Sequence, residues 1–260
     1  MYQEEHARVL EAANSKVNLL RTNPIGYFIS SMLAGGYVGL GILLIFSVGA
    51  PLQQAQSPVT KLVMGLSFGI ALSLVIMAGS ELFTGNVFVL GTALLRRSVR
   101  GRDATGILVV SYVGNLAGSL LVAWLFRMTG LGNGIVGAFI TQASVSKMAL
   151  PADQIFFRAV LCNLLVCLAV WCGFRCKEET ARLLMVFWCL FAFISSGYEH
   201  SVANMTLLSV GLFLPTTPDV TLMGFAYNVG MATLGNVAGA FLLLAVPYHV
   251  ISKEVPHAKA

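Results

Sequence analysis

The sequence predicts an all-α membrane protein with six transmembrane helices, arranged as an inverted three-plus-three repeat with two broken helices. Of the 260 residues, 57% are apolar and only 10% are charged, whereas a typical soluble domain carries about 25% charged residues. Six long apolar runs take up most of the chain. Two of these runs are too long for a single crossing, and each contains the same polar motif near its middle.

The six apolar runs define the candidate spans. A bilayer core is about 30 Å thick, so a helix of about 20 residues crosses it. The second and fifth runs are about half as long again, which indicates spans that are interrupted. The runs cover residues 27–48, 62–95, 106–126, 155–174, 183–213 and 222–250. They leave no room for a separate soluble domain, and the net charge of +5 requires no nucleic-acid partner because the basic residues lie at helix ends.

The chain is accordingly divided into five segments. An amphipathic helix on the cytoplasmic face is expected in residues 1–23, where apolar side chains recur at helical spacing opposite acidic ones. Asn23-Pro24 should end this helix, because the residue before a proline is biased out of the helical region. The other segments are a first three-span repeat (24–127), a glycine-rich external loop (128–152), a second three-span repeat (153–250) and a cytoplasmic tail (251–260).

Lysines and arginines are distributed unequally between the two sides of these spans. Cytoplasmic loops of membrane proteins carry an excess of Lys and Arg, so the richer side is assigned to the cytoplasm and both termini are expected there. The richer side holds Arg8, Lys16, Arg21, Arg96, Arg97, Arg100, Arg102, Arg175, Lys177, Arg182, Lys253 and Lys259. The other side holds Lys61, Arg127, Lys147 and Arg158.

The repeat is visible in two motifs. Both overlong runs read Gly-x-Glu-x-x-x-x-Asn, and the two copies, 79–86 and 197–204, are 118 residues apart. The third and sixth runs share Gly-Asn-x-x-Gly, at 114–118 and 235–239, with an offset of 121. A unit of three spans is odd, so its second copy enters the membrane from the opposite side and gives an inverted repeat.

The broken helices are expected to meet near the membrane midplane and to form a transport site there. Their free N-terminal N–H groups suit an anion. Glu81 and Glu199 are expected to bind backbone N–H groups that the breaks set free. Intramembrane ionisable residues also mark transport pathways, so Glu199 and Asn204 of the second motif are counted among the candidate pore residues.

The two copies differ at the positions where chemistry is expected. His200 corresponds to Leu82, and Thr84 corresponds to Val202. His200 is the single histidine well inside an apolar run, without a second axial ligand for haem and without a ligand cluster for zinc. One protonatable group among apolar neighbours suits a gate or a proton donor for a small anion. The five cysteines form no CxxC pair, and no cofactor is predicted.

Lys147 lies in the external loop as one of the few cations on that side. It is either a solvated loop lysine or a charge that draws anions into the outer mouth, since charged funnels raise the local concentration of substrate.

These motifs resemble the formate/nitrite transporter family, whose members are bacterial inner-membrane channels for small monovalent anions. The segments that carry the resemblance are 79–86, 161–171 and 196–205, and the glycine-rich first span at 35–41 is similar to the nitrite-channel branch. The resemblance implies an aquaporin-like fold, assembled as a homopentamer with a pore in each protomer. It also implies nitrite as the anion, with formate or hydrosulfide as the alternative.

The resemblance further implies roles for single residues. His200 becomes the central pore histidine, Lys147 the vestibule lysine and Thr84 a hydroxyl on the first broken helix, with Asn163 and Asn236 as polar partners near the site. Leu82 and Phe193 are expected to form an outer apolar constriction, and Phe68 and Leu72 an inner one.

Protonation of the anion would ease its passage through apolar rings, because a charge at the bilayer centre costs about 2.5–3.5 kcal/mol. Whether His200 donates the proton or stabilises the anion while water protonates it stays open at this point. A membrane enzyme that uses His200 as a base is disfavoured, because the sequence offers no nucleophile–base pair. A purely structural protein would leave the unequal repeat unexplained.

Overall fold

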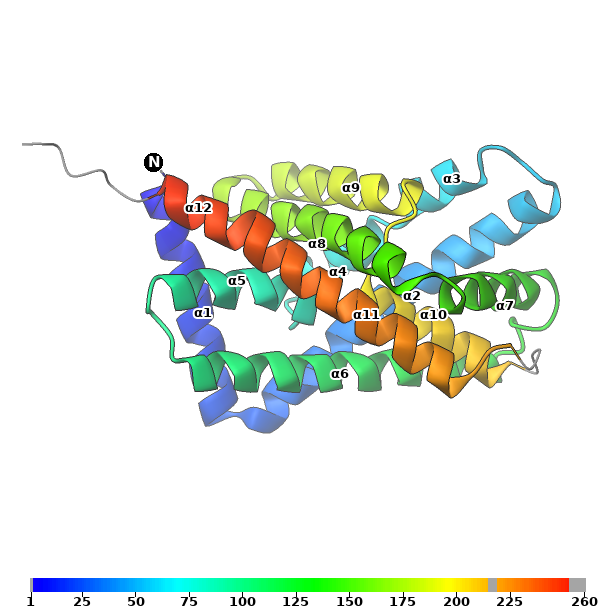
Figure 1. Cartoon of the computed structure of the whole chain (residues 1–260), viewed down its shortest axis with the longest axis horizontal. Helices are drawn as coiled ribbons and strands as arrows, with labels where there is room; N and C mark the ends of the chain where they lie inside the picture. Colours follow the sequence, from blue (N-terminus) through cyan, green and yellow to red (C-terminus); the bar gives the residue numbers. More distant parts are fainter. Residues whose placement is uncertain (1, 215–218, 253–260) are drawn as a thin grey trace, which may run out of the picture.

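The computed structural model describes residues 2–214 and 219–252, and within these ranges it contains helices and no strand. Figure 1 shows the long helices running along the longest axis of the molecule, with α1 lying across their ends. The all-helical class that the composition predicts is therefore confirmed. Lys253 and Lys259, which contribute to the predicted orientation, lie outside the described residues.

The N-terminal amphipathic helix is α1 (Gln3–Thr22), and its buried side chains are His6, Val9 and Ala13. Asn23 separates it from α2 (Pro24–Gln54), as the Asn-Pro pair predicts. The Asn23 side chain accepts a hydrogen bond from the Gly26 N–H at 2.9 Å, so it caps the new helix. Both α1 and α12 (Val246–Ile251) lie at the same end of the molecule (Figure 1), where the Gln3 side chain donates to the Ser252 carbonyl.

The second apolar run is interrupted twice rather than once. It contains α3 (Thr60–Ser67), α4 (Ile70–Met77) and α5 (Phe83–Leu95). The short step between α3 and α4 places Gly69 against Phe187, where a side chain would crowd the ring. The predicted break is the wider one, between α4 and α5. The helix α6 (Gly101–Met128) then completes the first half of the chain.

The segment predicted as an external loop, 128–152, contains the helix α7 (Ile135–Met148), so the prediction of a loop is corrected there. Its apolar pattern is weak because two of its three buried residues are small. Gly137, Ile140 and Ser144 are buried, and Ser144 lies close to Gly211 of α10 (Ser201–Phe213). Lys147 therefore lies on the last turn of a helix that packs against the molecule.

The second half continues with α8 (Ala152–Arg175), α9 (Glu179–Ser195), α10 and α11 (Leu222–Ala240). A π-helical turn, η1 (Phe241–Ala245), leads into α12. The π turn directly precedes Pro247, which has no N–H to continue the regular α-helical ladder.

Glycines bring two pairs of helices into backbone contact. Gly35 of α2 and Gly118 of α6 face backbone carbonyl groups of the opposite helix, and Gly235 and Gly239 of α11 do the same against α8. Small residues at such positions let helices pack closely in lipid. The glycines of the first span therefore contact other helices of the same chain.

Five helical stretches among the described residues are long and apolar enough to cross a membrane. They are Pro24–Gln54, Thr60–Met77, Gly101–Met128, Ala152–Arg175 and Leu222–Ile251. The apolar helices α5 and α10 have 13 residues each, which is about 20 Å and too short to cross alone. Many large apolar side chains on the long helices stay exposed, among them Leu33 and Leu40 of α2, which suits contact with lipid.

Candidate functional site

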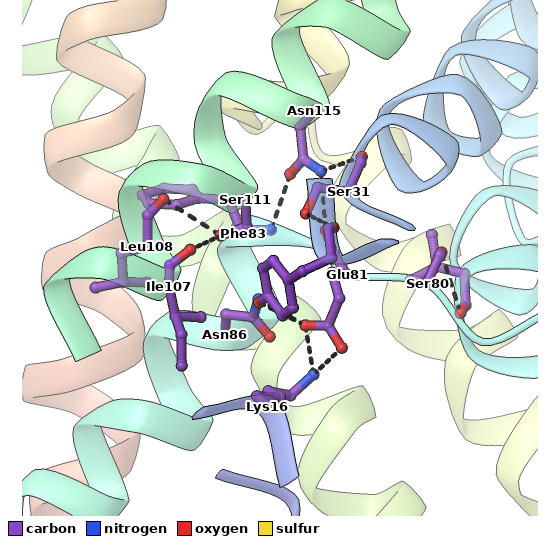
Figure 2. A network of polar contacts seen from close by, with 12 residues as sticks. Lys16, Ser31, Ser80, Glu81, Phe83, Asn86, Ile107, Leu108, Ser111 and Asn115 are labelled. Atoms are coloured by element: carbon purple, nitrogen blue, oxygen red, sulfur yellow. Dashed lines mark hydrogen bonds and ion pairs between the residues drawn. The ribbon is translucent and has the colours of Figure 1, made fainter. Parts of the chain in front are cut away.

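The first helix break lies between α4 and α5, and a single asparagine from α6 closes it. Gly79 adopts the left-handed conformation with φ of 71°, which turns the chain out of α4. The Asn115 side-chain oxygen accepts from the Phe83 N–H at 2.8 Å, and its amide nitrogen donates to the carbonyls of Ser31 at 2.7 Å and Glu81 at 2.9 Å. Asn115 thus binds the Phe83 N–H and the Glu81 carbonyl at the break and joins them to the Ser31 carbonyl of α2 (Figure 2).

The Glu81 carboxylate at this break points toward α1 and is neutralised there. Lys16 Nζ lies 2.7 Å from both carboxylate oxygens, as Figure 2 shows. The Tyr27 hydroxyl and the Asn86 amide also donate to it, at 2.9 Å and 3.0 Å. The side chains of Lys16 and Glu81 are 19% and 12% exposed, so this is a largely buried ion pair.

The second break, between α9 and α10, repeats this arrangement residue by residue. Gly197 is left-handed with φ of 73°. Asn236 of α11 accepts from the Ser201 N–H at 2.8 Å and donates to the carbonyls of Ala159 at 2.8 Å and Glu199 at 3.0 Å. The Gly-Asn-x-x-Gly motif therefore places an equivalent asparagine clamp at each break.

The Glu199 carboxylate is the most deeply buried charge of the site, with its side chain 2% exposed. Lys147 Nζ lies 2.7 Å from one of its oxygens, and the Asn204 amide donates to the other at 2.6 Å. Asn228 accepts from Asn204 and donates to the Lys147 carbonyl, which ties the pair to α11. Lys147 is therefore not a solvated loop lysine, whereas its predicted role in drawing anions into the outer mouth stays a prediction.

The expected role of the two glutamates is corrected by these contacts. Glu81 and Glu199 accept hydrogen bonds from lysine, tyrosine and asparagine side chains, whereas the backbone N–H groups at the breaks are bound by Asn115 and Asn236. An asparagine suits this position because its amide both donates and accepts, and a break frees carbonyls as well as N–H groups.

His200 is the N-cap residue of α10 and is 4% exposed. Its Nδ1 accepts from the Ala203 N–H at 3.1 Å, and its Nε2 lies 3.0 Å from the Thr84 hydroxyl oxygen. An Nδ1 atom that accepts a hydrogen bond carries no proton, so the hydrogen-bond pattern assigns the proton of the neutral ring to Nε2. Taking up a second proton at Nδ1 would cost His200 its cap on the helix.

Thr84 and Asn163 connect His200 to the clamp of the second half. Thr84 is fully buried, and its carbonyl accepts from the Asn163 amide at 3.3 Å and from the Cys167 thiol at 3.4 Å. The Asn163 amide also donates to the Asn236 carbonyl at 2.8 Å. The predicted residues His200, Thr84, Asn163 and Asn236 are thus brought together in one polar cluster.

Three cavities follow one another past His200. An outer cavity of about 250 Å³ is lined by Lys61, Lys147, Asn204 and His200. A central cavity of about 10 Å³ contacts His200 as well, and this volume is about the minimum for one water molecule. An inner cavity of about 160 Å³ lies among Ile76, Val170 and Arg182. Ile76 and Val170 follow Leu72 and Val166 of the central cavity by one helical turn.

The four predicted constriction residues, Leu82, Phe193, Phe68 and Leu72, all line the central cavity. The rings of Phe68 and Phe193 meet edge to face with centroids 5.4 Å apart, so the two predicted constrictions touch, and their division into an outer and an inner pair stays a prediction. The Phe193 ring also stacks on His200 at 5.9 Å. Phe68 therefore lies against Phe193, while Leu72 lies one turn further along toward the inner cavity.

The chain is similar to known proteins over nearly its whole length. The model of the formate/nitrite transporter family matches residues 3–250. The nitrite transporter NirC of Salmonella typhimurium is 43% identical over 240 residues, which cover 91% of this chain and 88% of that protein. NirC of Escherichia coli is 42% identical over the same length.

Solved structures agree in fold. One, described as an FNT family ion channel, has a TM-score of 0.90 at 40% identity and covers 96% of this chain and 99% of its own. A pentameric formate channel with formate bound has a TM-score of 0.76 at 26% identity, with coverage of 93% and 98%. The chain therefore belongs to the formate/nitrite transporter family, a family of transporters and channels rather than of enzymes.

Proposed function

We propose that this protein is an inner-membrane channel for a small monovalent weak-acid anion, with nitrite as its main substrate. The choice of nitrite rests on two nitrite transporters at 42–43% identity, compared with 26% for the formate channel structure. Formate is the second candidate because of that same structure, and hydrosulfide, another small weak-acid anion, is the third.

The observation that carries the proposal is the position of His200. It lines both the outer and the central cavity, with Nε2 directed at Thr84 and Nδ1 held by the helix cap. In this arrangement the neutral ring offers an N–H donor to an anion that arrives from the outer cavity. The Nε2–H of His200 holds the anion while a hydronium ion of that cavity protonates it and becomes water, so the neutral acid continues and His200 stays uncharged.

Two apolar rings on either side of the central cavity would exclude the charged form. Phe68 and Phe193 make the outer ring in this proposal, and Leu72 with Leu82 makes the inner one. A space that holds about one water molecule cannot hydrate an anion. The neutral acid avoids most of the roughly 2.5–3.5 kcal/mol that a charge costs at the bilayer centre.

The proposed architecture has six crossings. Five are the long helical stretches, and α9 together with α10 makes the remaining one, which is fifth in chain order. The matching clamps at Asn115 and Asn236 support an inverted three-plus-three repeat, with aquaporin-like broken helices. The ion pairs Lys16–Glu81 and Lys147–Glu199 extend this correspondence to α1 and α7. The repeats would then be 24–127 and 153–250, preceded by α1 and α7 respectively.

We also propose a homopentamer in the bacterial inner membrane, with both termini cytoplasmic. The pentameric formate channel at a TM-score of 0.76 supports the number five, and the bacterial relatives support the membrane. Arg8, Lys16 and Arg21 on α1 support the orientation, because Lys and Arg are enriched on the cytoplasmic side.

The test compares His200→Asn with the wild-type protein in liposomes, where nitrite and formate uptake are measured at several pH values with the membrane potential clamped. Asparagine is a favoured N-cap residue, so the variant keeps the cap of α10 and should fold and assemble normally. We expect wild-type nitrite flux to rise as the external pH falls and to carry little net charge.

The variant should lose most of this acid-stimulated flux. If the anion must cross in its charged form, the barrier rises by about 2.5–3.5 kcal/mol, which corresponds to roughly a hundredfold lower rate of nitrite transport. An Asn variant that kept the wild-type pH profile would remove His200 from the mechanism. Faster wild-type uptake of formate than of nitrite would favour the second candidate.

A further inference from the structure

The inner cavity contains a cation that the proposed pathway does not yet use. Arg182 lies in the first turn and a half of α9 and lines the cavity with Ile76, Val170, Gly173 and Phe174. In the described part of the chain, Arg182 takes part in no ion pair, and its buried Nε atom has no hydrogen-bond partner. An unsatisfied buried donor of this kind costs stability unless something binds it.

The position of Arg182 is not explained by the stability of α9. The N-terminus of a helix carries a partial positive charge, so a cation in its first turns is unfavourable rather than favourable. The aliphatic part of the side chain lies over Gly173 of α8, where a hypothetical Cβ would meet its Cγ and Cδ at 3.5 and 3.6 Å. Gly173 therefore leaves room for the arginine stem, and the guanidinium is held at the cavity instead of extending freely into solvent.

The inner cavity lies on the line of the pore. The central cavity is lined by Leu72 of α4, Val166 of α8 and Leu190 of α9, and the inner cavity is lined by residues of the same three helices. Along each helix the step leads toward the end where α1 and α12 lie in Figure 1. With a volume of about 160 Å³, the cavity holds a small anion together with several waters.

Two other cations near the pathway, both lysines, are neutralised by glutamates. Lys16 and Lys147 are each bound to a glutamate at 2.7 Å, so their charges are cancelled locally. Arg182 combines a charge without a carboxylate partner, a positive helix end and a partly enclosed cavity, three features that favour a bound anion. Arginine also presents several N–H donors in one plane, which matches the two oxygens of a nitrite or carboxylate ion.

We infer that Arg182 and the inner cavity form a binding site for the transported anion at the cytoplasmic mouth of the pore. The inference rests on the proposed function as an anion channel and adds a second place where the anion waits before it passes the apolar rings. During export the anion binds at this site before it enters the pore. During import it reaches the same site after it has passed the apolar rings.

The experiment measures nitrite efflux and uptake in proteoliposomes with the protein in one orientation, checked by protease access to an N-terminal tag. Arg182→Gln should raise the apparent KM for transport from the cytoplasmic face by about three- to tenfold at low salt, because one local charge has been removed. The KM for uptake from the outer face should stay unchanged. High salt should shrink the difference between variant and wild type.

Two control variants separate the site from surface charge and from folding. Lys177→Gln removes an exposed charge from the connection between α8 and α9, without touching the cavity, and should leave both KM values unchanged. Arg182→Lys keeps the charge and should restore most of the inner-face affinity. An unchanged inner-face KM in Arg182→Gln, or an equal rise in Lys177→Gln, would overturn the inference. A wild-type protein that conducts no small anion would instead contradict the proposed function itself.

Discussion

Removing the Lys147 charge should destabilise the protein far more than a surface substitution would. In Lys147→Met the Glu199 carboxylate, 2% exposed, loses Lys147 and keeps the Asn204 amide as its hydrogen-bond partner. Breaking a buried ion pair from one side costs about 3–5 kcal/mol, because the other charge stays buried without compensation. For a chain of this size that corresponds to a fall in thermal midpoint on the order of 10 °C.

The structure also predicts the order of four related variants. Glu199→Gln should cost less than Lys147→Met, because the Lys147 side chain is 23% exposed and its charge can reach water. The double variant Lys147→Met/Glu199→Gln should recover most of the loss, since no buried charge remains. Lys16→Met should cost about half as much as Lys147→Met, because Glu81 is 12% exposed and keeps both Tyr27 and Asn86.

Thermal unfolding of the purified oligomer in mild detergent, followed by intrinsic fluorescence and by loss of the oligomer peak, measures all four variants. Wild-type stability in Lys147→Met would refute the reasoning. A double variant no more stable than Lys147→Met alone would refute it as well, because the loss would then not come from the uncompensated carboxylate.

Three further outcomes are expected. Gly118→Ala should lower the stability of the fold by about 3 kcal/mol, because the added Cβ would overlap the Met32 carbonyl. Gly230→Ala is the matched control, since a Cβ there meets no atom within 4 Å. The yield of monodisperse protein is measured for both variants and should fall only in Gly118→Ala. Lys61 lines the outer cavity and forms no ion pair within residues 2–214 and 219–252. Lys61→Gln should therefore raise the KM of nitrite uptake about threefold at low salt and leave the saturating flux unchanged. A concentration series of nitrite uptake checks both values. Burial lowers the pKa of His6 below its ordinary value, so the docked α1 is stabilised by the neutral form of His6. Docking of α1 should therefore weaken as the pH falls below about 6.5. Faster hydrogen exchange in α1 at pH 5.5 than at pH 7.5 would support this, and identical exchange in wild type and His6→Gln at both pH values would contradict it.

Much of the site was predictable because a duplication repeats its polar residues at one spacing. The Gly-x-Glu-x-x-x-x-Asn motif recurs at both breaks, and in each copy the glutamate accepts a hydrogen bond from the asparagine of the same motif. The positions of the breaks followed from the same motif, since a left-handed glycine and a charged residue cannot continue an apolar helix.

The lysine partners were not predictable in the same way. Lys16 and Lys147 are 131 residues apart, so the 118-residue offset of the motif does not connect them. Lys147 lies on α7, which gives little apolar periodicity because two of its three buried residues are small. Sequence spacing shows which residues recur, but which side chains touch depends on how short helices pack across the ends of long ones.

The pairing of the constriction residues also depended on the fold. Phe68 lies just where α3 ends, and the step to α4 turns its ring toward Phe193. That step comes from Gly69 in close contact with Phe187, a tertiary contact between distant segments. No local pattern in the sequence distinguishes this glycine from the others in the same run.

The two asparagine clamps bear on how the chain is made. Among the described residues, the hydrogen-bond partners of the Asn115 side chain and of the Glu81 carboxylate all come from before position 127. The partners of the Asn236 side chain and of the Glu199 carboxylate all come from residues after it. At a synthesis rate of about 5–20 residues per second, roughly 6–25 seconds pass between the emergence of the first half and that of the second. During this interval the polar groups at the first break can already be hydrogen-bonded within the nascent first half, before the second half has been synthesised.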